Sequence, residues 1–124
     1  MNAPIAPFLR AEEIDHLVHL AFQVQPMRNE TTMERSNVEG TRHVLEEALS
    51  AGVDHITVLS SATAYGAYPD NPLRLTEKAP LRAFCSFSHP RHKALVESRI
   101  AHLRVRARIT CHLGAQMWCR WDTK

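Results

Sequence analysis

This sequence has no long apolar run, no strong charge of one sign and no signal-like start. No stretch approaches the roughly 18 apolar residues that a membrane-spanning helix needs. Residues 1–10 contain two prolines and lack the apolar segment of a secretory signal. The net charge of +2 is too small to indicate nucleic acid or an anionic membrane as a partner. We therefore expect a cytoplasmic protein that binds neither.

Cysteine and histidine are not arranged as metal ligands. The three cysteines are odd in number and lack metal-site spacing, so reduced thiols are the simplest interpretation. His16 and His19 would point to opposite faces of a strand. His89 and His92 share a helix face, but no third ligand is evident and no His-Glu-x-x-His pattern occurs. We expect no metal site.

The length and composition allow one small domain. The chain has 124 residues, of which 44% are hydrophobic, enough for a single core. Residues 1–13, with Pro4 and Pro7, are expected to form a loose leader. Residues 16–22 and 55–59 are short and almost continuously apolar. Such runs are typical of strands that are covered on both faces of a parallel sheet.

A helix is predicted between these two strands. Thr31 and Glu34 match the capping-box pattern, so the helix is expected to start there, and Gly52 is a plausible C-terminal stop. Gly40 lies inside this helix, where glycine costs about 1 kcal/mol relative to alanine. A close approach of the backbone to a neighbouring strand or ligand would explain it.

A second helix and a third strand are predicted further along the chain. Ser88 can cap the helix, with Pro90 in its first turn. Residues 104–109 alternate basic and apolar side chains, which is typical of an edge strand with one solvent-exposed face. The order strand, helix, strand, helix, strand predicts an α/β fold with a parallel sheet over residues 14–109. Residues 110–124 show no period and are expected to form an irregular tail.

Four stretches carry a family resemblance, in the family's order and spacing. They are Val18-His19-Leu20-Ala21, Asn37-Val38-Glu39-Gly40-Thr41, the run from Leu59 to Gly66, and Leu75-Thr76-Glu77 with Pro80. They resemble the fourth-strand motif, the Asn-x-x-Gly-Thr motif, the Ser-Ser-x-x-x-Tyr-Gly motif and the loop before the catalytic helix of extended short-chain dehydrogenases/reductases. This is the NAD-dependent epimerase/dehydratase family. The resemblance implies the central part of a Rossmann-like doubly wound sheet.

The resemblance also implies catalytic roles. Ser61 matches the hydroxyl that hydrogen-bonds the reacting oxygen, and Lys93 matches the lysine that holds the nicotinamide ribose. His89 stands where the family has its proton-exchanging tyrosine. A neutral imidazole could accept a proton from an alcohol, and a charged Lys93 four residues later would favour that form. The alternative is a helix-start histidine in a degenerate site, with Ser61 a hydroxyl that only caps a turn.

Cofactor contacts follow from the same resemblance. NAD or NADP is implied, with Ala21 and Phe22 lining the cleft through their backbone, Ser60 and Lys93 nearby, and Asn37 as a structural or relay residue. The family begins with a glycine-rich turn that holds the pyrophosphate. None of the four glycines here forms that turn. We therefore expect tight dinucleotide binding to be lost.

Two functional hypotheses remain open at this stage. The chain is either a fragment or degenerate form of an enzyme that moves a hydride on a nucleotide sugar or related hydroxy/keto compound, or a non-catalytic remnant. A remnant would leave an open sheet edge and uncovered apolar faces, which favour self-association or a partner that completes the sheet. Histidine at position 89 favours the second hypothesis.

Overall fold

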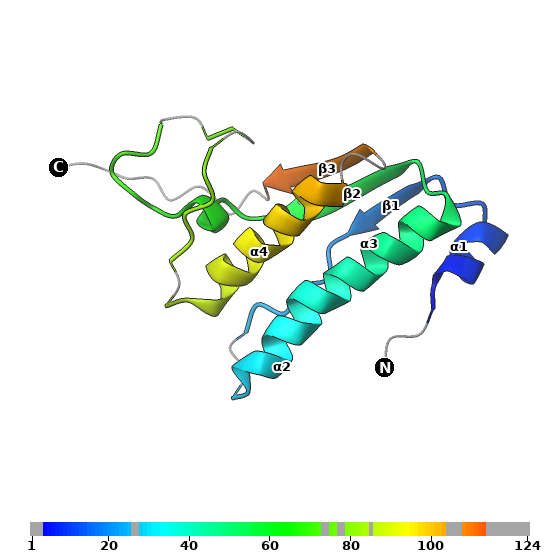
Figure 1. Cartoon of the computed structure of the whole chain (residues 1–124), viewed down its shortest axis with the longest axis horizontal. Helices are drawn as coiled ribbons and strands as arrows, with labels where there is room; N and C mark the ends of the chain where they lie inside the picture. The colour runs from blue at the N-terminus through cyan, green and yellow to red at the C-terminus, as the bar shows by residue number, and fades with distance from the viewer. Residues whose placement is uncertain are drawn as a thin grey trace.

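The computed structural model describes residues 4–25, 28–72, 75–76, 79–84, 86–103 and 108–113. Helices and strands alternate along the chain. The elements are α1 (Ala6–Ala11), β1 (His16–His19), α2 (Glu30–Glu34), a π-helical turn η1 (Arg35–Glu39), α3 (Gly40–Ala51), β2 (His55–Ser60), a 3₁₀ turn η2 (Ala62–Tyr65), α4 (Ser88–Leu103) and β3 (Arg108–Leu113). Figure 1 shows that α2, η1 and α3 run on as one long helix beside α4.

The three strands form one parallel sheet in the order β1-β2-β3. His16 pairs with His55 at the start of the first ladder, and His55 pairs with Arg108 at the start of the second. Because the neighbouring strands are parallel, all strand carboxyl ends lie at one edge of the sheet. The predicted α/β fold with a parallel sheet is confirmed.

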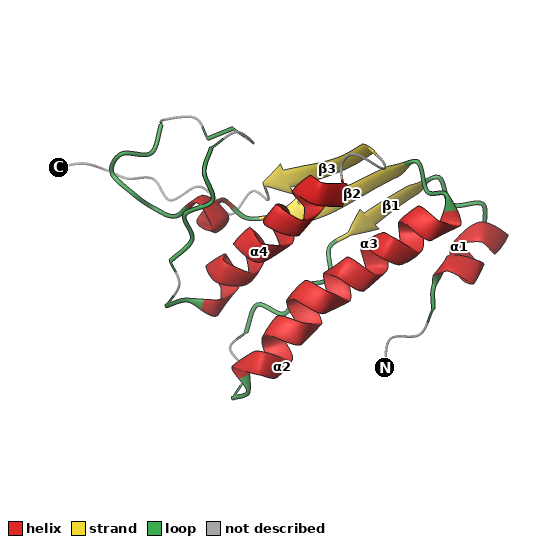
Figure 2. Ribbon diagram, viewed as in Figure 1, coloured by secondary structure: helices red, strands yellow, loops and turns green. Residues whose placement is uncertain are grey.

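Helices α3 and α4 pack on one face of this sheet (Figure 2). Ile56 and Val58 of β2 point into this layer and are fully buried. They meet apolar side chains from each neighbouring helix. The buried core cluster consists of Leu9, Val38, Leu45, Ala48, Val53, Ile56, Val58, Val96, Ile100 and Ile109. The core therefore lies between one helical layer and one sheet face.

The opposite face of β1 is open, contrary to the expectation that this strand is covered on both faces. Val18 is 53% exposed, and Leu20, just after the strand, is 60% exposed. His16 also lies on this side, with its Nε2 2.9 Å from Thr57 Oγ1. His19 points the other way, toward α3, so the two histidines lie on opposite faces as expected.

The N-terminal segment is not a loose leader. It forms α1, whose Leu9 joins the core. The Glu47 carboxylate of α3 accepts hydrogen bonds from the backbone N–H groups of Ile5 and Ala6, at 2.8 and 3.0 Å. A carboxylate at a helix N-terminus satisfies donors that the helix itself leaves unpaired. Pro7 fits within this helix because proline is tolerated in a first turn.

The first long helix starts earlier than the capping-box pattern predicts. Asn29 is the N-cap, and its side chain accepts a hydrogen bond from Thr32 N at 3.0 Å. Gly52 ends the helix at φ +86°, as predicted. Gly40 has φ −61°, and apart from its own helix no described residue has an atom within 4 Å of where its Cβ would be. The expected close approach of Gly40 to a neighbouring strand is therefore wrong.

The last two elements also differ in detail from expectation. Ser88 is the first residue of α4, and its hydroxyl donates to Glu30 Oε1 at 2.9 Å instead of capping the helix. Pro90 does lie in the first turn. Strand β3 runs to Leu113, so it includes residues 110–113 of the expected irregular tail. Residues 104–107 of the predicted strand lie outside the described residues. The rest of that tail, 114–124, lies outside the described residues. None of the described helices is long and apolar enough to cross a membrane.

The packing of α1 predicts that it belongs to the cooperative domain. Replacing Leu9 by alanine should lower the free energy of unfolding by about 2–5 kcal/mol, because the change removes buried methyl groups. Phe8 on the same helix is exposed, so Phe8→Ala should change the free energy of unfolding by less than about 0.5 kcal/mol. Urea unfolding of both variants measures the difference. Equal, small effects would show that residues 1–13 are a leader after all.

Candidate functional site

Lys93 is the centre of the candidate site. It lies in α4, and only 6% of its surface is exposed. Its ammonium group donates a hydrogen bond to the backbone oxygen of Leu59, near the carboxyl end of β2, at 2.6 Å. The same Nζ atom lies 3.7 Å from the centre of the Phe22 ring. A carbonyl oxygen and an aromatic face both stabilise a cation that burial has removed from water.

His89 joins this group through Phe22. The two rings meet edge to face with their centres 5.5 Å apart. His89 is half-buried and lies one helical turn before Lys93. The structure therefore brings together Phe22, His89 and Lys93, three of the residues that the sequence singles out. Ala21, next to Phe22, is exposed.

Burial and the nearby ammonium group keep the site histidines neutral. Burial is the largest cause that lowers the pKa of His89; the charge of Lys93 lowers it further, as does His92 when it is protonated. The pKa of His19 is lowered by burial and then by Lys93. Its Nε2 lies 3.0 Å from Thr41 Oγ1, which holds the ring against α3. A neutral imidazole at position 89 can accept a proton.

Ser61 lies at the turn that follows β2. It is the N-cap of η2, and its hydroxyl lies 2.9 Å from Thr63 Oγ1 and accepts a hydrogen bond from Thr63 N at 3.3 Å. The side chain is half-buried. The turn itself packs against α4. Ser61 therefore stands beside the helix of Lys93, in a hydrogen-bonded cap.

Glu97 holds this turn in place, although no sequence motif singles it out. One of its carboxylate oxygens accepts a hydrogen bond from Ser60 Oγ, and the other accepts one from Tyr65 OH at 2.8 Å. Ser60 directly precedes Ser61, and Tyr65 is the last residue of η2. The signal in the sequence is spacing, because Glu97 follows Lys93 by four residues and so shares its helix face. Ser60 therefore contacts α4, whereas the family resemblance implies a cofactor contact for it.

The loop after η2 is tied back to the same turn. Gly66 has φ +73°, and an added Cβ would lie 2.5 Å from Arg82 O and 2.4 Å from a ring carbon of Tyr68. Arg82 lies over the Tyr68 ring at 4.2 Å and pairs with Asp70 at 2.8 Å. Figure 1 shows this loop beyond the carboxyl ends of the strands, the edge where ligands bind in open α/β sheets.

Loss of the Glu97 carboxylate should loosen the Ser61 turn. Glu97→Ala should lower the free energy of unfolding by about 2–3 kcal/mol, because two hydrogen bonds to a charged acceptor disappear. It should also speed amide exchange at Ala64 and Gly66, whose N–H groups close this turn. The matched control is Glu46→Ala, which breaks only an exposed pair with Arg42 and should cost less than about 1 kcal/mol. Equal effects in urea unfolding would contradict the clamp.

The lowered pKa values of His19 and His89 predict the direction of the pH dependence. Unfolded histidines bind protons below pH about 6.5, whereas these folded ones bind them only at lower pH. Their contribution to stability is therefore present above pH about 6.5 and is lost as the pH falls below it. The urea concentration at the unfolding midpoint should decrease as the pH is lowered from 7.5 to 5.5. In His89→Gln this decrease should be smaller. The control is His102→Gln, at the exposed end of α4. A midpoint that rises on acidification would contradict this prediction.

Solved structures share this arrangement of elements. The UDP-Glc/GlcNAc 4-epimerase of Campylobacter jejuni is 24% identical, with a TM-score of 0.68, over 82% of this chain and 30% of that one. A UDP-glucose 4-epimerase from Brucella ovis in complex with NAD is 18% identical, with a TM-score of 0.72, over 86% and 33%. A dTDP-glucose 4,6-dehydratase double mutant from Streptomyces venezuelae with NAD bound is 24% identical, with a TM-score of 0.66, over 86% and 34%.

These likenesses establish a partial Rossmann-like fold. The chain spans about a third of the length of these proteins. No curated protein matches the sequence significantly. The sequence model of the NAD-dependent epimerase/dehydratase family matches residues 2–106, which is most of the chain. The chain therefore belongs to the NAD-dependent epimerase/dehydratase family.

Proposed function

We propose that this chain carries the nicotinamide half of a dinucleotide site and the acid/base centre of an epimerase or dehydratase. The substrate class is a nucleotide sugar or a related hydroxy/keto compound. The observation that carries the proposal is the contact of Lys93 with both the end of β2 and the Phe22 ring, with His89 packed edge to face against the same ring. Family membership and the names of the similar structures support the choice of reaction class.

Each site residue has a chemical task in this proposal. Ser61 donates a hydrogen bond to the reacting oxygen of the substrate. His89 takes the hydroxyl proton at a ring nitrogen, since its lowered pKa leaves the imidazole neutral near pH 7. Lys93 keeps His89 in this form and holds a ribose hydroxyl. Bound NAD or NADP would supply the hydride acceptor.

The described residues fit only one end of a dinucleotide. The nicotinamide end would meet Lys93 and Phe22 at the edge where the parallel strands end. The pyrophosphate end needs a glycine turn at the start of a helix. Among the described glycines, Gly52 ends a helix, Gly40 lies within one, and Gly66 is crowded by Tyr68 and Arg82. None of these can hold a pyrophosphate.

The open sheet face favours a second candidate function. Val18 is exposed on β1 and Leu20 is exposed just after it, and β1 lies at an edge of the described sheet. An edge strand with apolar neighbours is a template for pairing with another chain. In this alternative the chain is a non-catalytic module that pairs with a second copy of itself across β1. Light scattering would then give twice the monomer mass, and Val18→Lys would restore the monomer.

The binding of mononucleotides distinguishes the proposed nicotinamide site from the non-catalytic alternative. Nicotinamide mononucleotide should bind with a dissociation constant on the order of 1 mM, about as well as NAD, because only the nicotinamide end has contacts. AMP should bind at least tenfold more weakly. Lys93→Met should reduce binding of nicotinamide mononucleotide at least tenfold, while Phe8→Ala, at an exposed position on α1, should leave it unchanged. Titration calorimetry or ligand-observed NMR measures each value.

Three outcomes would contradict the proposal. AMP binding as tightly as nicotinamide mononucleotide would mean that the contacts are not specific for the nicotinamide end. Unchanged binding in Lys93→Met would remove Lys93 from the site. Micromolar binding of NAD would overturn the expectation that the pyrophosphate site is missing.

A further inference from the structure

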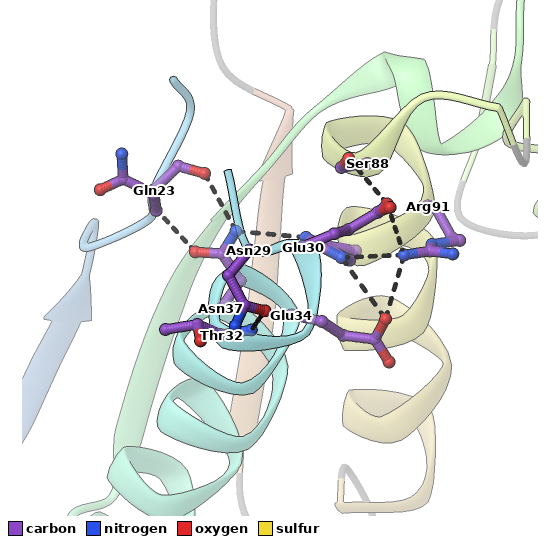
Figure 3. A network of polar contacts seen from close by, with 9 residues as sticks. Gln23, Asn29, Glu30, Thr32, Glu34, Asn37, Ser88 and Arg91 are labelled. Atoms are coloured by element: carbon purple, nitrogen blue, oxygen red, sulfur yellow. Dashed lines mark hydrogen bonds and ion pairs between the residues drawn. The ribbon is translucent and has the colours of Figure 1, made fainter. Parts of the chain in front are cut away.

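Asn37 clamps the loop that follows β1. It lies in the π-helical turn η1 and is 2% exposed. Its Oδ1 accepts a hydrogen bond from Gln23 N at 2.7 Å, and its Nδ2 donates one to Gln23 O at 2.9 Å (Figure 3). A backbone N–H can only donate and a carbonyl can only accept. The two bonds therefore fix which end of the Asn37 amide is oxygen and which is nitrogen.

The fixed amide in turn determines the protonation of His92. This ring is 0% exposed, and its Nδ1 lies 3.3 Å from Asn37 Nδ2. Because Asn37 Nδ2 is a donor, Nδ1 must be the acceptor and carries no proton. A neutral imidazole then has its proton on Nε2. Unlike Ser61, His89 and Lys93, His92 has no role in the proposed reaction.

The surroundings of Nε2 agree with a proton there. Nε2 lies 3.7 Å from Glu34 Oε2, which can accept. Arg91 Nη2 is 3.4 Å from Nε2, but this nitrogen already donates to Glu30 and Glu34 at 2.9 and 3.0 Å. A guanidinium Nη carries two hydrogens, and two carboxylates take them. Figure 3 shows these ion pairs bridging α2 and α4.

We propose that His92 is a positioning residue that, neutral and protonated on Nε2, holds the Asn37 clamp on Gln23. Gln23 directly follows Phe22, whose ring contacts both His89 and Lys93. The path runs from His92 to Asn37, to the Gln23 backbone and so to Phe22. Its importance for the site rests on the proposed function, whereas the tautomer and the clamp do not.

Protonation of His92 would disrupt this path. A charged imidazole donates from both nitrogens, so Nδ1–H would face the Asn37 donor. Arg91 and His89 on α4 disfavour the charge, and Glu30 and Glu34 on α2 favour it. Burial is the main cause that lowers the pKa of His92, followed by Arg91. The clamp is therefore intact above pH about 6.5 and weakens as the pH falls below this value.

Two measurements on the unmodified chain test the inference without a ligand. Long-range ¹H–¹⁵N correlation of histidine-labelled protein should show the Nε2–H tautomer for His92 at pH 7.5, the signal being assigned by its loss in His92→Phe. Amide exchange should give a protection factor for Gln23 that falls at least tenfold from pH 7.5 to 5.5. The amide of Val58, in the buried strand β2, should change less. An Nδ1–H tautomer or a charged ring at pH 7.5 would overturn the proposal.

Variants separate positioning from packing. His92→Phe fills the space without an acceptor, so Gln23 should lose protection at least tenfold and its pH dependence should disappear. His92→Gln offers an acceptor oxygen and should restore much of the protection, again without pH dependence. His102→Gln, an exposed change on the same helix, should behave as wild type. Unchanged Gln23 protection in His92→Phe would overturn the clamp.

Binding of nicotinamide mononucleotide then tests the link to the site. The His92→Phe substitution should weaken nicotinamide mononucleotide binding by about the same factor by which it lowers the protection of the Gln23 amide. If protection falls but binding is unchanged, the positioning role is overturned while the proposed function stands. If the unmodified chain binds no nicotinamide mononucleotide, the proposed function fails and the clamp is judged by the NMR measurements alone.

Discussion

The buried ammonium group of Lys93 ties together the three segments that make up the site. Removing a cation from water is costly unless polar or aromatic groups replace the water. Here the Leu59 carbonyl and the Phe22 ring do so, and they come from β2 and from the loop after β1. The position of α4 on the sheet is thereby fixed at the strand carboxyl ends. The same charge lowers the pKa of His89 and His19.

Helix α4 organises the rest of the site through two neighbouring rows of side chains. Residues four apart on a helix share a face, so Lys93 is in line with Glu97, and His92 is in line with the core residues Val96 and Ile100. His92 meets η1, Lys93 meets the end of β2, and Glu97 meets the turn of Ser61. The functional and the structural contacts of α4 are therefore interleaved.

Much of the architecture was predictable because the spacing of apolar residues and the residues that form turns can be recognised within short stretches of the sequence. Apolar runs located β1 and β2, and Gly52 located the end of α3. The errors arose where distant contacts override local pattern. Glu47 stabilises α1 from another helix, and the ladder with β2 extends β3 to Leu113. The apolar run of β1 predicted cover on both faces, because such a run does not show whether anything covers it; the open face agrees with the second functional hypothesis instead.

The sequence by itself determined the family, the order of strands and helices, and three of the residues that meet in the site. Motif order and spacing are properties of the chain and need no coordinates. Only the tertiary structure decided that the Phe22 ring contacts both His89 and Lys93, and that the Asn37 side chain binds the Gln23 backbone. These contacts join residues from separate elements across crossovers. The partner of a buried polar group depends on how the elements pack, which the sequence order does not specify.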